Sequence, residues 1–180
     1  MDIATRSDPI KRFNEGAKAS GWTFTCGPAT GFKRSELASA LALWREKAAG
    51  RTMPARSDMT ARAMKPFMPQ MSILERIGTG KDARYRVRLH GSVLASYAGD
   101  STGLFLDQVV PAPLIGSYAG VYDAVLEILA PVRLVSQFQA PKINYLAGES
   151  LVAPLSNPGK GSPLILSVTY VEAKAADSAV

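Results

Sequence analysis

The sequence predicts an α+β fold with two strands, a run of helices and then three strands. Three observations carry this prediction. In residues 84–90 apolar and basic side chains alternate with the period of a half-buried strand. In residues 114–129 apolar side chains recur at helical spacing. Clusters of Gly, Pro, Asn and Asp at residues 78–82 and 157–161 separate neighbouring strands as turns do.

The first 34 residues show no sustained periodicity and contain several Gly residues, which interrupt regular structure. We expect residues 1–34 to form a partly flexible arm with one short ordered piece around residues 21–25. This arm is either mobile or docked on a partner. At the other end, residues 173–180 are small and polar, and we expect a flexible tail.

A flanking helical segment is expected over residues 35–66. Its main helix runs from the candidate cap Ser35 to Gly50. Four apolar side chains of this helix recur at helical spacing: Leu37, Leu41, Trp44 and Ala48. A short helix is expected over residues 61–65, where the following prolines prevent its continuation.

The core is expected over residues 67–172. Strands at 71–77 and 84–89 form an antiparallel hairpin across the turn at 78–82. The alternation in the second strand places Tyr85, Val87 and Leu89 on one face. The same alternation places His90, the only histidine of the chain, on the opposite face beside the arginines.

After the hairpin, residues 92–113 read as short helical turns broken by Gly and Pro, and a longer helix ends at Pro131. The remaining strands are predicted at 132–139, 143–153 and 164–171.

Five motifs follow one another along this chain: Trp44, Pro54-Ala-Arg-Ser-Asp58, Arg84 to Gly91, Tyr97 to Gly103, and Asp107 to Pro111. In this order and spacing they resemble a bacterial family of PAS-like domains. The resemblance covers roughly residues 37–171. One departure is Ala98, an extra residue between Tyr97 and Gly99.

The resemblance implies a five-stranded antiparallel sheet with helices on one face. It also implies that the flanking helix packs on the sheet or against its copy in a second subunit. Leu37, Leu41 and Trp44 are the expected contact residues, in the core or across a homodimer, and both roles can hold at once.

An interior pocket between sheet and helices is the expected site of a small ligand, although a filled core is the alternative. Large rings with a hydroxyl, together with neighbouring apolar and acidic side chains, are candidates to line it. These residues are Tyr97, Leu104, Phe105, Tyr118, Tyr122, Tyr145, Glu149 and Tyr170.

Glu149 shares its strand face with apolar residues, so an inward-facing carboxylate would need a partner. Arg86 or Arg133 could supply one, and a ligand cation or hydroxyl is the functional alternative.

No cofactor is indicated. Haem-binding PAS domains take an axial histidine from the long helix, and residues 114–129 contain none. The single cysteine, Cys26, lies in the N-terminal arm instead of the helix used by flavin photoreceptors. One His and one Cys on separate elements give no metal ligand set. His90 has no nucleophile motif near it, and we expect no enzyme.

The chain carries a net charge of +6, concentrated between residues 35 and 90. The arginines stand singly, without a long cluster or interleaved aromatic residues, so we expect a solvated basic face and no nucleic-acid partner. No apolar run is long enough for a membrane span, and residues 1–10 lack an export signal. A cytoplasmic location is therefore expected.

No kinase, cyclase, phosphodiesterase or DNA-binding segment follows the last strand. Together with the resemblance, this predicts a stand-alone sensor or adaptor in bacterial signalling, acting through contact with a signalling protein, with or without a small ligand. The alternative is a protein that binds nucleic acid or an anionic surface through its basic half.

Overall fold

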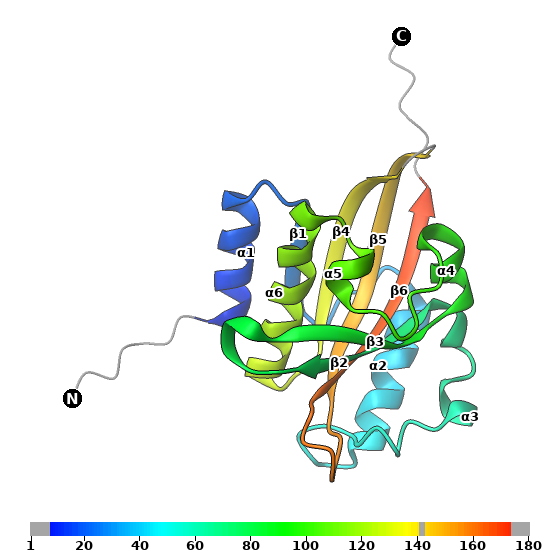
Figure 1. Cartoon of the computed structure of the whole chain (residues 1–180). Helices are drawn as coiled ribbons and strands as arrows, with labels where there is room; N and C mark the ends of the chain where they lie inside the picture. The colour runs from blue at the N-terminus through cyan, green and yellow to red at the C-terminus, as the bar shows by residue number, and fades with distance from the viewer. Residues whose placement is uncertain (1–7, 141–142, 174–180) are drawn as a thin grey trace, which may run out of the picture.

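The computed structural model describes residues 8–140 and 143–173. Within them the strands form one antiparallel sheet of six strands in the order β1-β4-β5-β6-β2-β3. The strand bounds are β1 Phe24–Pro28, β2 Met71–Ile77, β3 Arg84–His90, β4 Val132–Ala140, β5 Ile143–Leu155 and β6 Leu164–Ala173. The sheet twists strongly, so that β2 and β3 run across β4, β5 and β6 in Figure 1.

Helices cover both faces of this sheet (Figure 1). The helices α1, α4, α5 and α6 lie on one face, and α2 lies on the other. Their bounds are α1 Pro9–Ala19, α2 Ser35–Ala48, α3 Ala61–Met64, α4 Ser92–Ala98, α5 Leu106–Val109 and α6 Ala112–Ile128, with single 3₁₀ turns η1 Met68–Gln70 and η2 Gly80–Asp82. In the part of the chain that the structure describes, every helix is too short or too polar to cross a membrane.

The predicted α+β class, the antiparallel sheet and the flanking helix are confirmed. The helices that follow the hairpin cover one face as predicted, and the flanking helix α2 covers the other. The predicted number of five strands is wrong by one, because β1 joins the edge of the sheet beside β4. The additional strand comes from the segment that the sequence predicts as an arm.

The prediction of an arm with little ordered structure is wrong for most of the described N-terminal residues. Asp8 caps α1 by accepting a hydrogen bond from the backbone N–H of Ile10 at 2.9 Å. Phe24 then starts β1 opposite Ser136 of β4. Of the glycines in this segment, Gly16 lies within α1, Gly27 lies within β1, and Gly21 and Gly31 have the positive φ angles that turns require.

The free edge of β1 is covered by α1. The side chain of Asn14 donates to the carbonyl of Cys26 at 2.8 Å and accepts from the N–H of the same residue at 2.9 Å. One side chain thereby occupies both backbone groups that an edge strand leaves open. The helix and the strand therefore form one unit with the sheet.

Each face of the sheet has its own core. On the α2 face, Leu37, Trp44 and Leu151 are at most 5% exposed and pack with Met71 and Ile73. On the other face the core joins α1 and α6 to all six strands. Its fully buried residues are Val121, Val125, Val132, Val152 and Ile165. Side chains of alternate strand residues enter alternate cores.

A β-bulge in β3 changes that alternation. Val87 pairs with Leu74 of β2 and Leu89 pairs with Ile73, so Arg88 is the extra residue between them. As a result Leu89 packs on the α2 face while His90 joins Val87 on the other face. The predicted placement of His90 opposite Val87 is therefore wrong.

Candidate functional site

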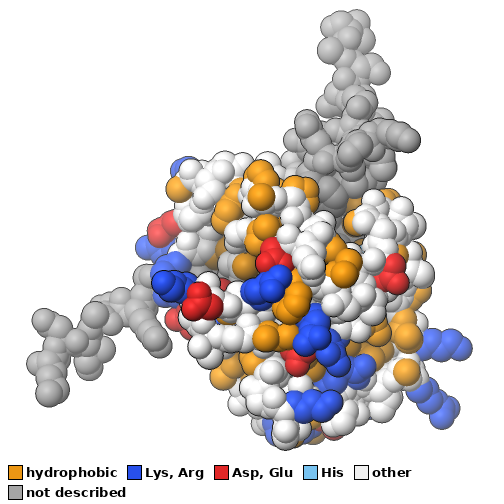
Figure 2. Space-filling model, viewed as in Figure 1, with side chains coloured by type: hydrophobic (Ala, Val, Ile, Leu, Met, Phe, Trp, Pro, Cys, Tyr) orange, Lys and Arg blue, Asp and Glu red, His pale blue; other side chains and the backbone are white. Residues whose placement is uncertain are grey.

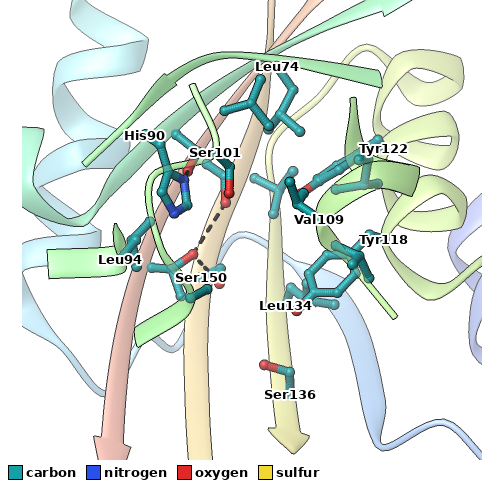
Figure 3. A pocket seen from close by; sticks show the side chains of 18 of the residues that line it. Leu74, His90, Leu94, Ser101, Val109, Tyr118, Tyr122, Leu134, Ser136 and Ser150 are labelled. Atoms are coloured by element: carbon teal, nitrogen blue, oxygen red, sulfur yellow. Dashed lines mark hydrogen bonds between the residues drawn. The ribbon is translucent and has the colours of Figure 1, made fainter. Parts of the chain in front are cut away.

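A cavity of about 210 Å³ lies between the sheet and the helices α4, α5 and α6. Figure 3 shows its lining side chains converging from both sides. The strands contribute a floor that includes several hydroxyl groups, and the helices contribute an apolar cover. This division gives the cavity two chemically different walls.

The polar wall is a row of hydroxyls that crosses neighbouring strands. Ser150 of β5 and Thr169 of β6 share a hydrogen bond of 2.8 Å between their hydroxyl oxygens, and Ser167 reaches Thr169 at 3.3 Å. Ser72 of β2 is paired with Ser167 in the sheet register and continues the row. Ser72, Ser150 and Ser167 are each less than 9% exposed. The row therefore places polar groups in a protected interior, where they need partners.

His90 ends this row on β3. Its Nδ1 lies 3.0 Å from the Ser72 hydroxyl, and its Nε2 is buried without a hydrogen-bond partner. Burial lowers the pKa of the His90 imidazole, against the opposing influence of the Asp100 charge and the Leu94 backbone. The ring is therefore neutral at neutral pH, with one nitrogen occupied and the other available.

The apolar wall centres on two tyrosines of α6. The Tyr118 ring meets Phe24 of β1 edge-on with centroids 5.3 Å apart, and the Tyr122 ring meets Tyr85 of β3 at 5.1 Å. Burial raises the pKa of both α6 phenols, so they stay neutral. Leu134 of β4 adds an aliphatic surface beside Tyr118. A ligand in the cavity would contact residues that connect directly to β1 and β3.

The helix α4 closes the cavity at one end. Leu94, Tyr97 and Ala98 of this helix line the space, yet none of its residues is buried, and Tyr97 is 48% exposed. Its start is held by the backbone N–H of Gly91, which donates to the Met71 carbonyl at 2.8 Å. The backbone packs so closely there that a Cβ at Gly91 would lie 2.3 Å from the Met68 carbonyl oxygen. The rest of α4 has few buried apolar contacts, which is typical of segments that open locally.

Of the residues predicted to line the pocket, Tyr97, Tyr118 and Tyr122 do so. Leu104 and Phe105 do not, because they run along the outer edge of β3. There the Phe105 ring lies 3.8 Å below the guanidinium of Arg84. The side chain of Tyr145 lies outside the described residues.

Glu149 and Tyr170 face the α2 side of the sheet, so the prediction that they line the pocket is corrected. Their neighbours Ser150 and Thr169 point into the cavity instead. The sequence alternation correctly indicates that Glu149 shares a face with apolar residues. It could not indicate that helices cover both faces of the sheet.

Glu149 finds its partners within the protein. Its carboxylate accepts hydrogen bonds from Arg133 Nε at 2.6 Å and from the backbone N–H groups of Lys33 and Arg34. Burial raises the pKa of this carboxyl, but these hydrogen bonds outweigh it and the pKa is lowered. Of the two predicted partners, Arg133 is the one that binds. Glu149 thereby fastens the segment before α2 to the sheet.

The flanking-helix residues Leu37, Leu41 and Trp44 are buried against the sheet of their own chain. Trp44 Nε1 also donates to the Pro154 carbonyl at 2.9 Å. A subunit contact through these three side chains would require α2 to leave the sheet.

Part of the basic surface is matched by carboxylates. Besides Arg133, six arginines pair with acids: Arg12 with Glu127, Arg34 with Glu172, Arg51 with Asp58, Arg76 with Asp123, Arg84 with Asp107, and Arg88 with Glu75. In Figure 2 several Lys and Arg side chains lie next to Asp or Glu side chains. This pairing reduces the positive potential that a phosphate backbone would meet.

Cys26 is buried on β1, and burial raises the pKa of its thiol to about 12. The thiol is therefore protonated and unreactive. In the ranges 8–140 and 143–173, no three side chains of His, Cys, Asp or Glu gather as a metal ligand set.

The polar wall is what sequence reasoning missed. Serines and threonines in strands carry no distinctive signal, and the face of His90 depends on the bulge. A weak signal was available in β6, where Ser167 and Thr169 alternate with the apolar residues Leu166 and Val168.

Comparison with known proteins agrees with this architecture. A family model described as a PAS domain matches residues 32–169, most of the chain. The chain therefore belongs to the PAS domain family. No curated protein and no solved structure shows a significant match. The matched range leaves out α1 and β1, so the covered sheet edge lies outside the family pattern.

Proposed function

We propose that this PAS domain is a sensor or adaptor that takes up a small ligand in the cavity under α4, α5 and α6 and acts on a signalling protein by direct contact. The role is not catalytic. The observation that carries the proposal is the cavity with its opposed polar and apolar walls. A domain that needed only a packed core would place aliphatic side chains where Ser72, Ser150 and Ser167 stand.

Two routes lead from the cavity to the surface. The helix α4 lies between the cavity and solvent and exposes Tyr97. On the other side, Tyr118 contacts the ligand space and also the ring of Phe24, which belongs to the α1–β1 unit. A ligand that moves either contact would change a surface that a protein partner can read.

The first test asks whether the cavity is occupied. Native mass spectrometry of freshly purified protein, followed by melting shifts across a small-molecule library, should reveal at least one bound compound. In the Ser150→Leu variant, the added side chain fills part of the cavity and should abolish the mass or melting shift. Ser57→Leu, an exposed position on the α2 side, is the matched control. Protein that stays empty against the whole library contradicts the ligand part of the proposal.

The second test asks whether the cavity controls partner contact. Cross-linked partners from the native host should differ between Ser150→Leu and wild type, whereas Ser57→Leu should capture the same partners as wild type. Identical capture by all three proteins would contradict a sensor role and leave an adaptor that ignores the cavity. Light scattering on the same samples measures whether the protein forms the expected homodimer.

A further inference from the structure

The lining of the cavity carries no formal charge. Among the described residues that border it, none is Asp, Glu, Lys or Arg, and the one titratable group besides the tyrosines is His90. A ligand carboxylate, phosphate or ammonium would lose its water without gaining a counter-ion. The lining therefore selects against charged molecules.

The polar wall nevertheless offers unused hydrogen-bonding capacity at one place. His90 Nδ1 is engaged by the Ser72 hydroxyl, which leaves the buried Nε2 as the free ring nitrogen. The three hydroxyls of Ser150, Thr169 and Ser167 each have one proton to donate and two lone pairs that accept. The two hydrogen bonds within the row use two of the three protons, so one proton and several lone pairs stay available for a ligand. These groups can both donate to and accept from the same ligand atom.

The rest of the lining is mostly apolar and requires an apolar body. Its residues include Leu74, Leu134 and Val152 from the strands and the rings of Tyr118 and Tyr122 from α6. A dry cavity of about 150 Å³ holds a single benzene ring. The volume of about 210 Å³ therefore suits a somewhat larger molecule, such as a short alkyl chain or a substituted ring.

We propose that the cavity takes an uncharged amphiphile with a terminal hydroxyl, whose oxygen sits between His90 Nε2 and the Ser150–Thr169–Ser167 row and whose apolar body lies against Tyr118 and Tyr122. This inference rests on the proposed function, since it takes the cavity to be the ligand site. A hydroxyl suits the site because it donates and accepts at once without carrying charge.

The test uses 1-octanol and octanoate, which share an alkyl chain and differ in the charge of the head group. Because His90 is the only histidine, the nitrogen signals of its ring appear as a single set in a long-range ¹H–¹⁵N spectrum of the full chain. At a pH where the ring is neutral, 1-octanol should shift the Nε2 signal more than the Nδ1 signal. It should also bind at least ten times more tightly than octanoate.

Two variants locate the hydroxyl. His90→Leu should weaken 1-octanol binding about tenfold, which corresponds to one hydrogen bond. Ser150→Ala should weaken it several-fold. Ser136→Ala is the matched control, because Ser136 is another cavity hydroxyl that lies away from His90 in Figure 3, and it should leave the affinity unchanged. Unfolding curves show which variants keep the fold. If His90→Leu does not fold, Ser150→Ala still tests the proposal.

Octanoate binding as tightly as 1-octanol, or equal effects of Ser150→Ala and Ser136→Ala, would overturn the ligand class while leaving a ligand-binding sensor in place. Absence of 1-octanol binding would also overturn the proposed ligand class. If the compound library and native mass spectrometry also find the cavity empty, both the ligand class and the ligand part of the proposed function fail.

Discussion

On the α2 face of the sheet, aliphatic and aromatic side chains form a closed core, and Trp44 donates to the Pro154 carbonyl. The buried carboxylate on this face, Glu149, is paired with Arg133. On the α6 face, the same strands alternate into a space that is partly empty and carries hydroxyls. The two faces share one backbone, since Leu151 enters one core while Ser150 and Val152 border the cavity. The difference indicates that the α2 face stabilises the fold, whereas the α6 face is less tightly packed and leaves space for a ligand.

The largest effect is expected on the closed face. Leu151→Ala should lower the free energy of unfolding by about 2–5 kcal/mol, because it leaves a void in a core that cannot collapse. Leu134→Ala on the other face should cost less, because Leu134 already borders empty space. Denaturant unfolding of both variants measures the two losses in free energy of unfolding. Equal losses would mean that the two faces are packed alike.

A second effect concerns the cover of the α6 face. A Cβ at Gly116 of α6 would lie 2.9 Å from the ring of Trp22, so Gly116→Ala should destabilise the α1–β1 unit by about 1–3 kcal/mol. Hydrogen exchange should rise in α1 and β1 before it rises in β5. Gly16→Ala is the control, because it adds a methyl in open space within α1 and should stabilise the protein by up to about 1 kcal/mol. Uniform exchange across the sheet in Gly116→Ala would contradict a separable unit.

A smaller effect is expected from the hydroxyl row. Ser167→Ala should change the free energy of unfolding by no more than about 1.5 kcal/mol, because the lost hydrogen bond to Thr169 is long and the methyl suits its surroundings. Thermal unfolding gives the value. A loss as large as that of Leu151→Ala would show that the row supports the fold instead of serving a ligand.

The smallest effect is the pH dependence that His90 contributes. Its pKa is lower in the folded protein than its ordinary value of 6.5, so the unfolded chain binds the proton more readily. The folded state should therefore be fully stable above pH 6.5 and lose stability as the pH falls below it. Comparing wild type with His90→Gln between about pH 7.5 and pH 5.5 isolates this contribution. Parallel pH profiles for the two proteins would rule it out.

Much of the element order is readable from the sequence. The predicted strand at residues 71–77 coincides with β2, and the predicted helix at residues 114–129 differs from α6 only at its ends. Both segments have strong periodicity, and local turn residues bound them. Tyr118 of α6 belongs to the apolar stripe of the predicted helix, whereas Tyr122 was named only as a large ring with a hydroxyl.

The sequence predictions that were wrong share a physical cause. Asn14 makes α1 and β1 part of the sheet through contacts with Cys26, twelve residues away, and no local pattern reports such a contact. The bulge at Arg88 moves His90 to the cavity, and a bulge depends on how the partner strand pairs. Glu149 and Tyr170 were assigned to the wrong core because period two separates the faces of a strand without saying which helix covers each.

Local preferences along this chain were enough to place the strands β2 to β6 and the helices α2 and α6. They also showed which side chains share a strand face where no bulge intervenes, because both follow from backbone geometry over a few residues. Only the packing of distant segments decided that two helical layers enclose the sheet, that the hydroxyls of β2, β5 and β6 line up beside His90, and that a space remains above them. Burial and hydrogen bonding in such a cavity depend on several elements at once, so they exist only in the folded chain.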